Sequence, residues 1–215
     1  MKNIISFIVL ICSVAVILTS CSKDEESTTD ATTTTSKTTT TPSGSITMGS
    51  YTASGVYLSS CFSGSSVSTL VSAGSLPSDA QSFGFAFVVT GDDSFTEETH
   101  VFTDTGCTTS TYISKLLRDN VTVGTASGAN YPVTYNDQGV KLTVNTTTAK
   151  TWLETLYANL GRTLDFTVGR EMGVYPVSPT LTYGLWTPGA TTIYLAEESD
   201  NSTPSTAGAI VQTKE

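Results

Sequence analysis

Most of the chain alternates apolar and polar residues with the two-residue period of a β-strand. Residues 83–89 place three phenylalanine rings on one side of such a strand, and residues 140–145 alternate apolar with polar side chains. Thr-rich alternation recurs at 95–104, 111–117, 121–125, 163–168, 180–185 and 191–196. Many short strands with frequent turns predict a mainly β fold, either a single antiparallel barrel or a sandwich.

Turn-forming residues separate these runs. The segments 90–93 and 136–139 combine Gly with Asp, Asn or Thr, and both predict hairpin turns. Pro176 and Pro179 confine the residues between them to a loop or a sheet edge. Acidic and Ser/Thr-rich residues at 197–207 predict a mobile loop, and 209–211 predict a short last strand.

One segment, 148–160, has the spacing of a helix instead. Its apolar residues recur three or four positions apart, which predicts one amphipathic helix. Thr147 or Thr148 would cap its start, Lys150 would face Glu154, and Gly161 would end it.

The first twenty residues predict an export signal. Lys2 precedes an apolar stretch at 4–18, which is shorter than the roughly 20 residues of a membrane span. Leu18-Thr19-Ser20-Cys21 follows, and this tetrapeptide resembles the lipobox of bacterial lipoproteins. The resemblance implies removal of residues 1–20, acylation of Cys21 with palmitate-type chains, and membrane attachment through that lipid. Several acyl chains together hold a protein firmly, because each buried methylene contributes about 0.8 kcal/mol.

Residues 21–44 predict a lipid-anchored, disordered tether, since they are rich in Ser and Thr and nearly free of apolar side chains. Ser22, next to the lipidated cysteine, favours the outer membrane over the inner one under the lipoprotein sorting pattern. The acidic residues at 24–26 either continue an export signal to the outer face or simply begin the tether. A β-rich domain is expected at 45–215.

The net charge of the chain bears on its possible partners, and its cysteines bear on disulfide formation. A net charge of −9, with 19 acids and 10 bases, argues against nucleic acid as a partner because no basic patch is available for phosphates. Of four cysteines, Cys12 leaves with the signal and Cys21 takes the lipid. Cys61 and Cys107 remain in an oxidising compartment, where a disulfide is expected rather than a two-cysteine metal site.

The sequence offers little catalytic chemistry. His100 is the only histidine, lies among acidic residues on a predicted strand, and is expected to face solvent. No nucleophile elbow, metal-binding spacing or phosphate-binding glycine loop accompanies it. We therefore expect no enzyme activity, no cofactor and no metal site. A hydrolase would need His100 or a pair of carboxylates in a cleft.

A second resemblance concerns the domain. Gly55-Val56-Tyr57 resembles the Gly-x-Trp opening of lipocalin-like barrels, with Tyr in place of Trp, and the Cys61 and Cys107 segments are similar to paired cysteines of extracellular lipocalin-like domains. The resemblance implies an antiparallel barrel that binds or carries a small apolar ligand. Residues proposed to face that ligand are Phe83, Phe85, Phe87 and Trp186.

Two alternatives stay open. The three phenylalanines can fill the barrel core instead of lining a cavity, and core filling is the favoured reading of the two. Trp152 is expected in the core, whereas Trp186, at a predicted turn, is expected to offer an exposed contact. A filled core would favour the second function, a structural or adhesive surface module without a small-molecule site.

Overall fold

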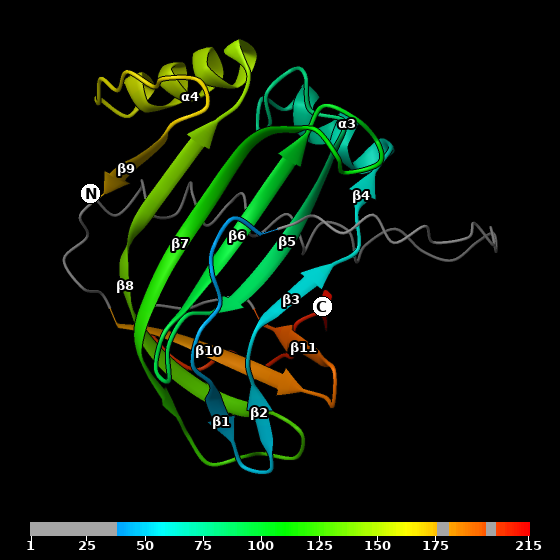
Figure 1. Cartoon of the computed structure of the whole chain (residues 1–215), viewed down its shortest axis with the longest axis vertical. Helices are drawn as coiled ribbons and strands as arrows, with labels where there is room; N and C mark the ends of the chain where they lie inside the picture. Colours follow the sequence, from blue (N-terminus) through cyan, green and yellow to red (C-terminus); the bar gives the residue numbers. More distant parts are fainter. Residues whose placement is uncertain (1–37, 176–180, 197–200) are drawn as a thin grey trace.

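The computed structural model describes residues 38–175, 181–196 and 201–215, and these contain twelve strands and two helices (Figure 1). The strands and helices are β1 (Ile46–Met48), β2 (Tyr51–Ala53), β3 (Val56–Ser59), β4 (Phe62–Ser63), α3 (Ser65–Ser72), β5 (Ser82–Val89), β6 (Phe95–Phe102), β7 (Ser110–Val123), β8 (Tyr131–Val144), α4 (Thr147–Asn159), β9 (Glu171–Tyr175), β10 (Leu181–Pro188), β11 (Thr192–Leu195) and β12 (Val211–Lys214).

Eight of the strands close into one antiparallel barrel. The order is β3, β5, β6, β7, β8, β10, β11 and β12, and every neighbouring pair is antiparallel. The last strand, β12, pairs with the first, β3, and completes the circle. The structure thus confirms the barrel prediction and excludes the sandwich. Closure pairs strand edges that an open sheet would leave exposed.

The strand β8 pairs with β7 along one edge and with two successive strands along the other, and this arrangement explains one wrong prediction. Its first half pairs with β10 and its second half with β9. Between the halves the register with β7 shifts, and Gly139 has φ 141°. The residues 136–139, predicted as a hairpin turn, therefore form an irregularity within one long strand. Likewise, the run 111–117 and the first three residues of the run 121–125 belong to the single strand β7, which ends at Val123.

Both ends of the barrel are covered. The β1–β2 hairpin lies at one end, where Ile46, Met48 and Ala53 join the same apolar cluster as Phe87 and Trp186. The helices α3 and α4 cover the opposite end (Figure 1), and their apolar residues pack with the inner surface of β5 to β8. The helix α3 was not predicted, because its eight residues are half serine and carry only a short apolar stripe.

The helix α4 confirms the predicted amphipathic segment. Thr146, one residue before the predicted cap, accepts a hydrogen bond from the backbone N–H of Ala149 at 3.1 Å. The helix is followed by Gly161 with φ 74°, the left-handed conformation that glycine adopts readily. The predicted ion pair between Lys150 and Glu154 is present.

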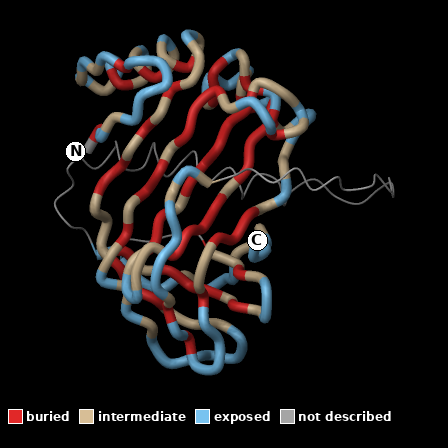
Figure 2. The backbone as a smooth tube through the Cα atoms, viewed as in Figure 1, coloured by how far each residue is buried: buried red, intermediate tan, exposed pale blue. Residues whose placement is uncertain are grey.

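Inside the barrel, aromatic rings pack in edge-to-face and tilted pairs. Phe87 lies 5.3 Å from Trp186 and 5.0 Å from Phe95, measured between ring centroids. Tyr135 lies 5.0 Å from Phe95. Figure 2 shows the resulting band of buried residues along the barrel strands. This half of the barrel is a packed core, as expected for a barrel of eight strands.

Smaller deviations concern the C-terminal third. The predicted strand at 163–168 is absent, and these residues form a loop after α4. The last strand begins at Val211, two residues later than predicted. Residues 201–207 contain no strand, in agreement with the predicted loop. Pro176 and Pro179, together with residues 197–200 of the predicted acidic loop, lie outside the described residues.

Candidate functional site

A groove of about 570 Å³ lies between α3 and α4 at the helix-covered end of the barrel. Its apolar lining comes from Val71, Leu76 and Trp152, with the backbone of Gly74 beside them. Its polar lining consists of side-chain hydroxyls from both sides, namely those of Ser78, Thr147, Thr148, Thr151 and Thr155. The volume falls within the range of about 300–1,000 Å³ that is typical of small-molecule sites, but the groove is open to solvent, and five of its nine lining residues are exposed.

Trp152 is held in place from two sides. Its indole N–H donates to the carbonyl oxygen of Gly74 at 3.0 Å, which joins α4 to the turn after α3. Its ring packs against Tyr112 of β7, with ring centroids 5.5 Å apart and planes inclined by 36°. The side chain is half-buried rather than in the core, so the expected core position is wrong. The ring is a fixed part of the groove wall.

A polar network fixes the start of α4 beside this groove. The carboxylate of Asp79 accepts hydrogen bonds from the hydroxyls of Thr111, at 3.0 Å, and Thr146, at 2.7 Å. Thr146 also caps α4, so Asp79 connects the loop before β5, the strand β7 and the helix. Asp79, which directly follows the groove residue Ser78, therefore already accepts two hydrogen bonds from hydroxyl groups of the protein.

The four residues predicted to face a ligand all lie on one surface of the barrel wall, but most are packed. Phe83 and Phe87 are 3% and 0% exposed, and Trp186 is 2% exposed, so the expectation of an exposed Trp186 is wrong. Trp186 is buried because β10 continues through it and ends only at Pro188. Phe85 is half-buried. The space beside Phe83 and Phe85 is about 10 Å³, no larger than one water needs.

A charged cluster that was not predicted from the sequence lies on the same inner surface of the barrel, beside Tyr135 of the aromatic cluster. Arg118 of β7 forms ion pairs with Asp137 of β8 and, at 3.5 Å, with Glu97 of β6. Its guanidinium carbon lies 5.6 Å from the ring centre of Tyr135. The Arg118 side chain is 4% exposed, whereas Glu97 and Asp137 keep 23% and 16%. The cluster joins three neighbouring strands next to the register shift in β7.

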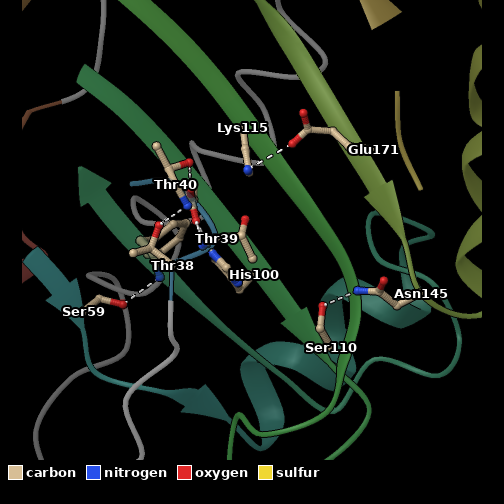
Figure 3. Close-up of polar contacts among 11 residues, drawn as sticks. Thr38, Thr39, Thr40, Ser59, His100, Ser110, Lys115, Asn145 and Glu171 are labelled. Atoms are coloured by element: carbon tan, nitrogen blue, oxygen red, sulfur yellow. Dashed lines mark hydrogen bonds and ion pairs between the residues drawn. The ribbon is translucent and has the colours of Figure 1, made fainter. Parts of the chain in front are cut away.

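The outer wall carries a second buried pair, Glu98 and His100 of β6 (Figure 3). His100 Nε2 lies 2.6 Å from a carboxylate oxygen of Glu98, and both residues are almost fully buried. The expectation of a solvent-facing His100 is therefore wrong. Thr39 donates its backbone N–H, and Thr40 its hydroxyl, to Glu98. Burial raises the pKa of Glu98, but hydrogen bonds with the His100, Thr40 and Thr38 side chains, together with the charge of His100, outweigh burial and lower that pKa below its usual value.

Residues 38–45 thus form a strap across β5 and β6. In addition to the bonds to Glu98, Ser43 donates its backbone N–H to the carbonyl oxygen of Val89 and its hydroxyl to the carbonyl oxygen of Thr90. Ser45 donates its backbone N–H to the carboxylate of Asp92. The sequence predicts a domain boundary at residue 45, and the described Thr39 and Thr40, which precede it, already bond to Glu98 of β6. The signal for this is weak in sequence, because Thr and Ser are shared by the strap and the preceding segment.

The expected disulfide joins Cys61 and Cys107, with a sulfur–sulfur distance of 2.04 Å. It connects the chain after β3 to the loop between β6 and β7. Asp104 organises that loop by accepting backbone N–H bonds from Gly106, Thr108 and Thr109. Within the described part of the chain, no group of three or more His, Cys, Asp or Glu side chains is placed to bind a metal.

Cys21, the predicted lipid attachment site, and Leu18, Thr19 and Ser20 before it lie outside the described residues. Neither described helix has the length and apolarity needed to cross a membrane. No protein-family model matches the chain, and no curated protein is detectably similar to it in sequence. The geometry of the barrel and its groove is therefore the main guide to function.

The groove residues were largely missed in the sequence. The pattern that would have found α3 is the apolar trio Val67, Leu70 and Val71, spaced as on one face of a helix. Once α3 is recognised, the Thr residues of α4 stand out as polar positions beside Trp152. The end of α3 at Ser72 and the start of α4 at Thr147 are 75 positions apart, and their proximity in the fold is a tertiary property that no local pattern contains.

Proposed function

We propose that the protein is a lipid-anchored binding protein of the bacterial outer membrane, whose lipocalin-like barrel presents a small-molecule site at its helix-covered end. The lipobox at Leu18–Cys21 supports the anchor, and Ser22 supports the outer membrane. The acylated Cys21 attaches the protein to the membrane, and the domain stands clear of the bilayer on the segment that follows.

The barrel supports the lipocalin-like assignment. Eight antiparallel strands follow one another around the circle in chain order, which is the up-and-down arrangement that lipocalins have. The paired Cys61 and Cys107 agree with the same resemblance. The sole histidine is packed against Glu98 on the outer wall and is not among the residues that line the groove.

The groove between α3 and α4 is the observation that carries the binding function. It combines a volume suited to a small molecule with a fixed aromatic ring and several hydroxyls. The aromatic half of the interior is closed by the β1–β2 hairpin and filled by its own rings. A ligand therefore binds between the helices rather than against Phe87 and Trp186.

A structural or adhesive surface module is the second candidate. The packed aromatic interior favours it, because a barrel that only displays a surface needs no cavity. The two functions differ in one measurable respect, which is whether the purified protein retains a small molecule.

The anchor is tested by labelling bacteria with a palmitate analogue and separating membranes from soluble protein. Cys21→Ser should abolish labelling and release the protein from the membrane, whereas Cys12→Ser should change neither, since residue 12 is expected to leave with the signal. Equal labelling of both variants would refute attachment through Cys21.

The site is tested by native mass spectrometry of the full chain, purified from the envelope in mild detergent. We expect a retained mass beyond the protein's own acyl chains. Thr151→Trp, which fills the groove, should remove it, and Thr125→Trp, the same change in an exposed loop at the other end, should not. Equal retention by both variants would place the ligand elsewhere. No retained mass in any form would favour the structural module.

A further inference from the structure

We infer that the groove between α3 and α4 takes a neutral saccharide, one pyranose ring of which lies against Trp152. The inference rests on the proposed function, in which this groove is the ligand site, and adds the chemical class of the ligand. Three properties of the lining lead to it: the absence of charge, the hydroxyl groups and the fixed indole.

The first property is charge. The chain has 19 acids and 10 bases, yet no charged side chain lines the groove. The adjacent Asp79 is engaged by Thr111 and Thr146. An ionic ligand, such as a fatty acid carboxylate or a phosphate, would find no charged side chain of opposite sign in the groove lining and would gain no charge-assisted hydrogen bond there. A neutral ligand needs no such partner.

The second property is the hydroxyl lining. Five Ser and Thr residues surround the groove, and a hydroxyl can both donate one hydrogen bond and accept others. The hydroxyl of Thr155 already donates to the carbonyl oxygen of Thr151 at 2.8 Å, so toward a ligand it acts as an acceptor. The hydroxyls of a sugar have the same dual capacity, so donors and acceptors on the two sides can be matched in either direction. A purely apolar ligand would instead strip water from these groups without replacing its hydrogen bonds, which costs free energy for each group. The lining therefore selects a polyhydroxylated ligand over a lipid.

The third property is the position of Trp152. The bond from its N–H to Gly74 and the contact with Tyr112 fix the ring before any ligand arrives. The C–H groups on one face of a pyranose carry partial positive charge and pack well on the electron-rich face of an indole. Because the ring is already ordered, little conformational entropy is lost on binding. Val71 and Leu76 extend the apolar surface beside it.

The test uses the full lipidated chain in mild detergent on an array of neutral oligosaccharides, with acidic glycans and palmitate as comparison probes. Hits are then titrated by calorimetry. Neutral saccharides should bind, and Trp152→Ala should weaken binding about tenfold or more, the effect of losing one stacked ring. Thr151→Val, which keeps the shape and removes one hydroxyl, should weaken it about threefold to tenfold. Thr125→Val is the matched control and should have no effect.

Circular dichroism establishes that each variant is folded, and Thr151→Val remains informative if Trp152→Ala is not. Binding of acidic glycans alone, or of palmitate displaced by Thr151→Trp, would overturn the saccharide class while leaving the groove as the ligand site. Saccharide binding that is unchanged in Trp152→Ala and Thr151→Val would overturn the inferred pose. If no probe binds and no mass is retained by the purified protein, the saccharide and the proposed binding function both fail.

Discussion

His100 Nε2 and a carboxylate oxygen of Glu98 lie 2.6 Å apart on the outer wall of the barrel, beneath the strap of residues 38–45. Two residues that are separated by one position on the same strand thus share one side of it, and the strap covers both. The pair links the N-terminal part of the domain to β6 through side chains rather than through strand pairing.

The Glu98 carboxylate should make stability depend on pH. Its pKa is lowered in the folded protein, so it adds stability above its unfolded value of about 4.5, and that stability is lost as pH falls through the folded pKa. Glu98→Gln should destabilise the protein by about 1.5–3 kcal/mol at pH 7, the range for hydrogen bonds to a charged group. Urea unfolding at pH 7, 5, 4 and 3 should show that the unfolding free energies of the wild type and Glu98→Gln become more similar as the pH falls.

Thr40→Val separates the strap contact from the charge. It removes one donor to Glu98 and should produce a smaller loss with a similar dependence on pH. A difference between wild type and Glu98→Gln that stays constant from pH 7 to pH 3 would contradict the role assigned to the carboxylate.

Replacing Arg118 alone should lower the free energy of unfolding strongly, whereas replacing it together with Glu97 and Asp137 should lower it only a little. Arg118→Met leaves Glu97 and Asp137 without their shared cation, and we expect a loss of about 3 kcal/mol, since breaking a buried ion pair costs about 3–5 kcal/mol and both carboxylates keep some solvent. Arg118→Met with Glu97→Gln and Asp137→Asn should recover most of it. If urea unfolding shows the same loss of unfolding free energy for Arg118→Met alone and for the triple variant, the cost comes from packing and not from unpaired charge.

The disulfide should stabilise the domain by limiting the unfolded chain. Cys61 and Cys107 enclose 46 positions, and the chain-entropy model gives about 4 kcal/mol for a loop of that size. Guanidinium unfolding of the variant with both Cys61→Ser and Cys107→Ser should show this loss of unfolding free energy. The intact mass of the wild type should be lower than that of its reduced form by the mass of two hydrogens. Identical unfolding curves with and without reductant would contradict the bond's contribution.

Gly44 should hold the strap against the turn after β5. It has φ +66°, and a Cβ there would lie 2.5 Å from a backbone carbon of Gly91. Gly44→Ala therefore adds a backbone clash to the roughly 1–2 kcal/mol of left-handed strain. Gly128→Ala is the matched control, since it has φ +63° but open space around it. Hydrogen exchange at residues 38–45 should rise in the first variant only.

Local patterns were enough to predict the barrel because period-two alternation was strong on β5 and β8. The bend in β8 was mistaken for a turn because Asn-Asp-Gln-Gly has the composition of one; pairing with β7, β9 and β10 on either side of Gly139 overrides that local preference. Tertiary pairing of this kind cannot be read from the segment itself.

The candidate site was less predictable for the same reason. Trp152 lies on the apolar side of a correctly predicted helix, and that pattern alone places it in the core. Its exposure depends on how far α3 stands from α4, which is set by residues distant in sequence. Arg118 and His100 are buried through partners on neighbouring strands or in the strap, so their isolated positions in the chain gave no indication of burial.

The pairing of β12 with β3 has a consequence for the order of folding. Leu58 and Thr213 are register partners although 155 positions separate them, so the circle cannot close until almost the whole domain is available to fold. Until then, the free edges of β3 and β11 are open to other chains. Contacts between such distant segments also slow folding. Chaperones that cover strand edges should therefore matter most for this protein in the interval before the barrel closes.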